Sequence, residues 1–218
     1  MNYINNLKSF PDSPGVYLMK AAGGEIIYIG KAKSLRKRLS SYLSKDLSAK
    51  TLRLMAKVAD IEYRLCPSES MALILEAGLI RELKPKYNTA LRDDKSFPLV
   101  KITNEEFPAV YVTRKKIAFG NNLFGDFRSA PYTFLSAKKE NDGARYFGPY
   151  TNAALLRQAL KIIRGYFPYR SCKTMPKKAC IYYRIKLSPA PCIGKISREE
   201  YAKTIKRISL ILEGKGQE

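Results

Sequence analysis

The segment from residue 14 to residue 30 constrains the fold of this chain more than any other segment. Two apolar runs rich in Val, Ile and Tyr flank the pair Gly23-Gly24. β-Branched and aromatic residues favour strands, and paired glycines accept the positive φ angles of a tight hairpin turn. The pattern therefore predicts a β-hairpin near the start of the chain.

Apolar periodicity predicts that helices and strands follow this hairpin in alternation. Ser68 is expected to cap the third of these helices, and Pro85 lies just beyond its end. Residues 116–144 are rich in Gly, Asn, Asp, Ser and Lys, which predicts a long loop. The expected elements are helices near 35–42 and 47–58, a strand over 61–65, a helix over 69–83, strands over 99–103 and 109–113, and helices over 152–166 and 198–212.

The charge of the chain points to a polyanionic partner. Forty Lys and Arg stand against nineteen Asp and Glu, giving a net charge of +21. Nine basic residues and one acidic residue lie between positions 31 and 57, and positions 153–195 hold ten basic residues and no acidic one. Nucleic acid is the expected partner, although an inert basic surface is the alternative. The expected DNA contacts are Lys33, Arg36, Lys37, Arg157, Lys161, Arg164 and Arg170.

Cellular location and redox state are inferred from what the sequence lacks. No run of about 18 to 20 apolar residues is present, and residues 1–14 contain no apolar core of a signal peptide. These features predict a cytoplasmic protein, in which the four cysteines are thiols or metal ligands rather than disulfides. The chain contains no histidine, which excludes Ser-His and Cys-His nucleophile pairs.

A set of polar residues spread over positions 17–88 suits phosphodiester hydrolysis. One carboxylate can hold a divalent ion, an arginine can neutralise phosphoryl oxygens, and a tyrosine made more acidic by nearby cations can accept a proton. Each residue also has a structural interpretation: tyrosines favour strands, the cations belong to a basic run, and Glu76 can pair with Arg38 or Arg81. The set comprises Tyr17, Tyr28, Lys31, Arg38, Glu76 and Asn88.

The order of these residues resembles the motif set of GIY-YIG nucleases. Gly-Val-Tyr at 15–17 precedes Tyr-Ile-Gly at 28–30, and the remaining residues of the set follow in the family's order. The segments Tyr-Ile-Gly-Lys-Ala-Lys-Ser-Leu-Arg-Lys-Arg-Leu, Leu-Glu-Ala-Gly-Leu-Ile, Lys-Pro-Lys-Tyr-Asn and Tyr-Phe-Gly-Pro-Tyr resemble the UvrC family in particular. This resemblance covers nearly the whole chain.

The resemblance implies a fold and an activity. The expected fold is α/β (α+β): a small mixed sheet flanked by helices in a nuclease domain over 1–95, a strand extension with a long loop over 96–150, and a helical, cysteine-containing DNA-binding region over 151–218. The implied activity is a DNA incision on the 3′ side of a lesion, with Mg²⁺ or Mn²⁺, during nucleotide excision repair, together with UvrB and UvrA.

The resemblance also implies a role for each site residue. Glu76 is expected to bind the metal and Arg38 to stabilise phosphate. Tyr28 is expected to accept the proton, while Tyr17 and Tyr42 shape the site. Lys31 is expected to orient phosphate or a tyrosine hydroxyl. Asn88 is expected to hold the framework of the site.

The chain departs from the UvrC pattern at the cysteines and in length. Cys172, Cys180 and Cys192 match three cysteines of the family, but Ser188 stands at the fourth position. Four thiolates normally hold an iron–sulfur cluster or structural zinc, so we expect a metal-free remnant rather than a cluster. The alternative is a site of these three cysteines completed by a serine or an external ligand. UvrC proteins continue into a UvrB-binding hairpin and a second nuclease domain, so this chain alone is expected to make only the 3′ cut. The alternatives are a catalytically silent nucleic-acid-binding adaptor and a stand-alone nuclease acting on branched DNA or RNA.

Overall fold

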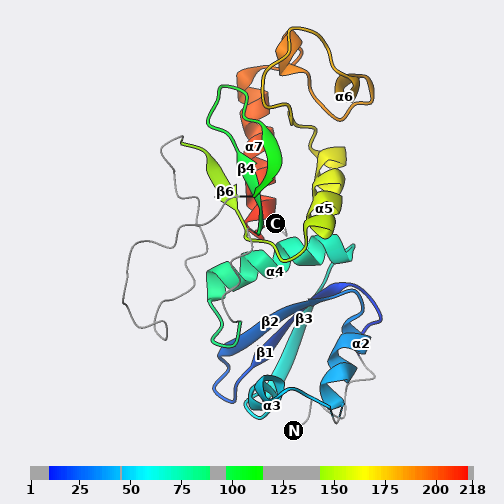
Figure 1. Ribbon diagram of the computed structural model, residues 1–218, viewed down its shortest axis with the longest axis vertical. Helices are drawn as coiled ribbons and strands as arrows, with labels where there is room; N and C mark the ends of the chain where they lie inside the picture. Colours follow the sequence, from blue (N-terminus) through cyan, green and yellow to red (C-terminus); the bar gives the residue numbers. More distant parts are fainter. Residues whose placement is uncertain (1–9, 45, 89–96, 115–142, 216–218) are drawn as a thin grey trace. The chain divides into compact units, whose positions relative to one another are not determined.

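The structure of the chain is a computed structural model that describes residues 10–44, 46–88, 97–114 and 143–215. The chain divides into two compact units, Met1–Asp93 and Asp94–Glu218. Each unit contains a small antiparallel sheet with helices (Figure 1). The described residues contain no helix that is both long and apolar enough to cross a membrane.

The first unit is built on a three-stranded sheet with the order β2-β1-β3. Strands β1 (Gly15–Lys20) and β2 (Ile26–Ala32) form the predicted hairpin, and β3 (Asp60–Leu65) pairs with the other edge of β1. Both pairings are antiparallel, so the sheet that we expected to be mixed is antiparallel over its described strands. Strands β2 and β3 run in the same direction, but they lie on opposite sides of the central β1 and do not pair with each other.

Because successive side chains of a strand point to opposite faces, β1 contributes to two separate cores. Val16 and Leu18 pack with residues of α4 (Glu69–Leu83), which lies across one face of the sheet (Figure 1). Tyr17 and Met19 face the other side, where they pack with residues of α2 (Leu35–Ser40), η2 (Ser41–Leu43) and α3 (Ala49–Met55). The candidate site lies on strands that are covered on both faces.

Serine side chains begin the helices of the first unit. Ser34, Ser48 and Ser68 each accept a hydrogen bond from the backbone N–H three residues later, at the start of α2, α3 and α4. Such caps satisfy one of the otherwise unpaired amides of a helix start and stabilise it by about 1 kcal/mol. The predicted cap at Ser68 is confirmed, and α4 ends at Leu83, before Pro85.

The second unit is built on a sheet with the order β5-β4-β6. Its strands are β4 (Pro98–Ile102), β5 (Val110–Arg114) and β6 (Arg145–Phe147), and its helices are α5 (Ala153–Tyr166), α6 (Ile181–Arg184), η3 (Pro191–Ile193) and α7 (Arg198–Leu212). The buried hydroxyl of Tyr201 on α7 joins the parts: it donates to Pro108 O at 2.6 Å and accepts from Arg170 N at 2.9 Å.

The predicted fold class is confirmed, and the predicted helices and strands lie within a few residues of the observed ones. The elements that the periodicity missed are short: β6, α6 and the two 3-10 helices η2 and η3 each have three or four residues. Segments of this length contain too few positions to show a repeating pattern. The predicted loop over 116–144 falls almost wholly outside the described residues.

Candidate active site

Two tyrosine hydroxyls and one guanidinium meet on one face of the first sheet. Tyr17 of β1 and Tyr42 of η2 share a buried hydrogen bond of 2.7 Å between their hydroxyl oxygens. Arg38, on the last turn of α2, donates from Nε to Tyr17 at 3.3 Å and from Nη2 to Tyr42 at 3.4 Å. These two donor distances are long for N–H···O bonds, so the guanidinium is held near the hydroxyls but weakly. It also lies 5.1 Å from the centre of the Tyr42 ring.

Gly30 makes room for the Tyr17 ring. The two residues face each other across β1 and β2, and a Cβ atom at position 30 would lie 2.3 Å from the Tyr17 hydroxyl oxygen. A real Cβ atom does not approach an oxygen so closely, so a side chain here would displace the ring. The glycine of the Tyr-Ile-Gly motif is thus explained by the tyrosine of the Gly-Val-Tyr motif.

Tyr28 of β2 lies beside this cluster. Its ring centre is 6.1 Å from that of Tyr17. Burial raises the pKa of Tyr28 to about 12, and the charges of Tyr42 and Glu76 act in the same direction. Burial likewise raises the pKa of Tyr17 well above its ordinary value. The expectation that nearby cations make a tyrosine more acidic is therefore not met in this structure, because burial outweighs the charge of Arg38 at Tyr17.

Arg38 itself stays fully charged. Burial disfavours its charge, but the interactions with Tyr17, Tyr42 and Tyr28 outweigh burial and raise the pKa of the guanidinium. A permanent cation that is only weakly held by its hydroxyl partners can turn toward an incoming phosphate oxygen.

Glu76 of α4 approaches the site from the end of β2. Its Oε1 accepts a hydrogen bond of 2.9 Å from the backbone N–H of Lys31. Burial raises the pKa of Glu76, while this bond and the positive charges of Lys31 and Arg38 act against that shift. The structural alternative of an ion pair between Glu76 and Arg38 is not found among the ion pairs of the described residues. As far as the described residues show, the second carboxylate oxygen, Oε2, therefore remains for a ligand such as a metal ion.

The side chain of Lys31 has a partner that sequence reasoning missed. Its Nζ donates to Glu69 Oε1 at 2.7 Å, and both side chains are largely shielded from solvent. Glu69 lies in the first turn of α4. A spacing of seven residues puts Glu69 and Glu76 on the same face of α4, and this spacing is the signal that could have linked both to Lys31.

Asn88 ties the segment after α4 to the hairpin. Its amide forms two hydrogen bonds with Ile29, accepting from the backbone N–H at 2.8 Å and donating to the carbonyl at 2.7 Å. Next to it, Tyr87 N donates to Ile27 O at 2.9 Å. Asn88 therefore extends the hydrogen bonding along the β2 edge of the sheet, beside Tyr28, which agrees with the framework role expected for it.

In the described residues, a divalent cation would be held by the single carboxylate of Glu76 rather than by a cluster of several ligating side chains. The described residues contain no group of three or more His, Cys, Asp or Glu positioned to hold a metal ion. Mg²⁺ is commonly bound through one or two carboxylates while water and substrate phosphates complete its shell. The partly buried Glu76 carboxylate, with Oε1 oriented by the backbone N–H of Lys31, matches this mode of binding.

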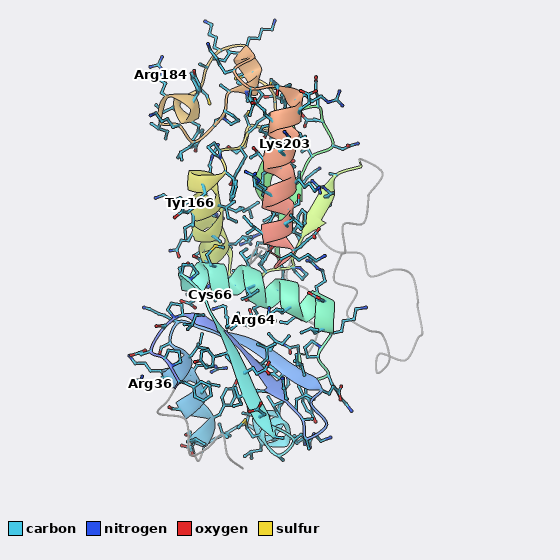
Figure 2. All side chains as sticks on the ribbon, turned by 180° about the vertical axis from the view of Figure 1, so that it is seen from behind. Arg36, Arg64, Cys66, Tyr166, Arg184 and Lys203 are labelled. Carbon is cyan, nitrogen blue, oxygen red and sulfur yellow. The ribbon has the colours of Figure 1, made fainter. Side chains whose placement is uncertain are left out.

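The predicted DNA contacts divide into two groups. Five are exposed: Lys33, Arg36, Lys37, Arg157 and Lys161. Figure 2 labels Arg36 on α2. Arg164 and Arg170 are instead buried, at 9% and 2% exposure, and their guanidinium groups hydrogen-bond to carbonyls of the protein. Both belong to the scaffold of the second unit rather than to a surface for phosphates.

The cysteines of the second unit are free thiols. Cys172 is exposed, while Cys180 and Cys192 are partly buried. Cys192 Sγ lies 3.8 Å from the carbonyl of Lys178, and the neighbouring Ser188 is buried. No shared site for the three thiols follows from these contacts.

Both units match known protein families. Residues 13–89 match the family described as the UvrC-like GIY-YIG domain, and residues 130–210 match the middle domain of the UvrC/Cho excinuclease. The UvrABC system protein C of Carboxydothermus hydrogenoformans is 42% identical over all of this chain, which covers 33% of that protein. The corresponding protein of Clostridium novyi is 43% identical over 97% of this chain. The chain thus spans about a third of the length of these relatives.

One solved structure matches part of this chain. It is the N-terminal GIY-YIG endonuclease domain of UvrC from Thermotoga maritima, bound to magnesium as its catalytic divalent cation. The sequences are 40% identical, and the match covers 40% of this chain and 97% of that one with a TM-score of 0.38.

Proposed function

Because this chain belongs to the UvrC family, we propose that it is a metal-dependent endonuclease that hydrolyses DNA phosphodiester bonds. The observation that carries this proposal is the grouping of two strand tyrosines, Tyr17 and Tyr28, with Arg38 of α2 and Glu76 of α4 around one small sheet. It supplies a cation, hydroxyl groups and one carboxylate without histidine. The reaction we propose is the 3′-side incision of nucleotide excision repair, in which UvrA and UvrB are the partners and the location is cytoplasmic.

Each residue has a distinct task in the proposed reaction. Glu76 holds Mg²⁺ or Mn²⁺, an ion that polarises phosphorus and stabilises the leaving oxygen when bound. Arg38 leaves its weak contacts with Tyr17 and Tyr42 and donates to the phosphoryl oxygens, where charge develops in the transition state. Lys31 presents its backbone N–H to Glu76 and so keeps the carboxylate oriented.

Tyr28 is the proposed proton acceptor, although its pKa of about 12 keeps it neutral at pH 7. The negative charge of Glu76 is one of the influences that raise this pKa. Neutralising that carboxylate with a divalent cation removes this influence and brings the pKa of Tyr28 closer to the working pH. Tyr17 and Tyr42, paired with each other, are proposed to hold Arg38 near the site until the phosphate binds and to position the Tyr28 ring.

The first test is cleavage of end-labelled duplex DNA that carries a lesion or a nick. The purified chain is incubated with Mg²⁺, Mn²⁺ or EDTA, alone and with UvrA and UvrB. We expect metal-dependent cutting that falls about 1000-fold or more in Glu76→Gln, since removing one essential electrostatic group typically lowers a rate by 10²- to 10³-fold and the metal is lost as well.

The matched control is Glu82→Gln, the same change at an exposed glutamate of the same helix. It is expected to cut like the wild type. Binding without cutting by the wild type under every condition would contradict the nuclease proposal and favour a DNA-binding adaptor. Equal cutting of a matched RNA would contradict the DNA specificity, because the 2′-hydroxyl is the group that distinguishes the two substrates.

A further inference from the structure

An aromatic side chain in the second unit lies against a fixed cation. Tyr182, in the short helix α6, has its ring centre 4.0 Å from the guanidinium carbon of Arg164 on α5. The same guanidinium lies 4.9 Å from the centre of the buried Tyr169 ring. Residue Tyr182 is 42% exposed, whereas Tyr169 is 4% exposed. In this pair, Arg164 is buried and Tyr182 is the member that reaches the surface.

Hydrogen bonds fix both members of this pair. Arg164 donates from Nε to Leu187 O at 2.7 Å and from Nη2 to Tyr169 O and Ser171 Oγ, both at 3.0 Å. Leu187 N in turn donates to Tyr182 O at 2.8 Å. The backbone that carries the ring is thus bonded to the same residue that accepts from the guanidinium. A ring held in this way loses little conformational freedom when a ligand stacks on it.

The surroundings of Tyr182 are strongly basic. Positions 153–195 contain ten Lys or Arg and no acidic residue. Exposed cations lie on both sides of Tyr182 along the chain: Lys177 and Lys178 precede it, and Arg184 and Lys186 follow it. Figure 2 labels Arg184 on α6 and Tyr166 at the end of α5, on the same edge of this unit. An aromatic platform flanked by flexible cations is the arrangement with which proteins bind single-stranded nucleic acid.

We propose that Tyr182 is a stacking platform for an unpaired nucleobase, and that the exposed cations beside it contact the adjoining phosphates. The proposal gives Arg164 a role different from the phosphate contact inferred from sequence: it holds the ring. It deepens the proposed function, on which it rests, by naming the state of the substrate that the second unit recognises. The bound DNA would have a base outside the duplex stack.

Binding measurements in EDTA test the platform without cleavage. The probes are a single strand, a duplex with one bulged 2-aminopurine, and the same duplex fully paired. We expect Tyr182→Leu to weaken binding of the single strand and the bulged duplex by about 5- to 20-fold, within the range known for one base–aromatic stack. Binding of the paired duplex is expected to change less than about 2-fold, since phosphate contacts remain. Quenching of 2-aminopurine fluorescence in the bulge is expected to disappear.

Two controls separate stacking from other effects. Tyr182→Phe keeps the ring and is expected to bind and quench like the wild type. Tyr166→Leu removes a tyrosine that is 79% exposed in the same unit and is expected to have little effect on either. Because Tyr182→Leu also loses the ring contact with Arg164, its unfolding temperature is expected to fall, but by no more than about 4 °C, so the folded state is still the species that binds.

The outcomes distinguish this inference from the proposed nuclease. An unchanged affinity and unchanged quenching in Tyr182→Leu, with Glu76→Gln still abolishing cleavage, would overturn the platform alone and leave Tyr182 for a protein partner. An equal loss on paired and unpaired probes would also overturn it. If unpaired probes bind through Tyr182 while no metal or partner yields cleavage, the platform stands and the nuclease proposal fails.

Discussion

Each unit of the molecule contains an arginine beside tyrosine rings, yet the two arginines are held in different ways. Arg38 in the first unit is exposed and reaches two hydroxyls at 3.3 and 3.4 Å. Arg164 in the second unit is buried and donates to two carbonyls and a hydroxyl at 2.7 to 3.0 Å. Short bonds to carbonyl groups make an arginine part of the scaffold, whereas long bonds to hydroxyls leave it available to a ligand.

The same contrast applies to the acidic partners. Arg170 in the second unit pairs with Glu105 at 2.6 Å and donates to three backbone carbonyls. In the first unit, Glu76 accepts one backbone hydrogen bond and stays unpaired with Arg38 among the described ion pairs. A complete set of partners indicates a structural role, and an incomplete set at a buried group indicates a site for a ligand.

Replacing Arg38 gives the largest effect expected from this comparison. We expect Arg38→Ala to lower the cleavage rate by about 10²- to 10³-fold, because a donor to the developing phosphoryl charge is lost. The unfolding temperature is expected to stay within about 2 °C of the wild type, since the lost hydrogen bonds are long. Arg53→Ala, an exposed arginine of α3, is the control for loss of charge alone. A large loss of stability in Arg38→Ala would remove the distinction between the two arginines.

Replacing Arg170 is expected to affect stability rather than catalysis. Arg170→Ala leaves the carbonyls of Phe107, Cys172 and Lys173 and the carboxylate of Glu105 without their donor. The free energy of unfolding should fall by about 3 kcal/mol, the usual scale for breaking a buried charged network. Urea denaturation measures this, with the exposed Arg157→Ala as control. A stable Arg170→Ala variant with weakened DNA binding would instead support the phosphate contact predicted from sequence.

Adding one methyl group at position 30 tests the packing of the tyrosine cluster. The new Cβ of Gly30→Ala would clash with the Tyr17 hydroxyl, so the ring must move. We expect a loss of about 1 to 3 kcal/mol in the free energy of unfolding and a fall in cleavage. Gly23→Ala, in the hairpin turn with open space around its Cβ, is the control. A crystal structure of Gly30→Ala with the Tyr17–Tyr42 hydrogen bond intact would argue against the tight fit.

The smallest expected effect is a dependence of stability on pH at Glu76. Burial raises the folded-state pKa of this carboxyl group above its value in the unfolded chain. The folded state then binds the proton more tightly, so stability falls as pH rises from the unfolded pKa through the folded one. Glu76→Gln removes this loss, and its stability relative to the wild type should increase between pH 4 and pH 7. Denaturation curves at both pH values measure it, and a pH-independent difference would contradict the assigned shift.

The sequence determined the local features of this protein. The hairpin, the capped helix after Ser68 and the order of the tyrosine, arginine, glutamate and asparagine motifs follow from patterns carried by neighbouring residues. The resemblance of those motifs to the UvrC family also came from sequence, and the family matches confirmed it.

Only the tertiary structure decided which charged side chains have their hydrogen-bonding groups paired within the protein. From the sequence, the same role as a DNA contact was expected for four residues, because all of them lie in one basic run: Arg157, Lys161, Arg164 and Arg170. Two of the carbonyls that hold these arginines are distant in the chain: Leu187 lies 23 residues from Arg164 and Phe107 lies 63 residues from Arg170, and only folding brings them together. Burial in that fold also set the raised pKa of Tyr28 and Glu76, because desolvation depends on the atoms packed around a group rather than on its neighbours in sequence.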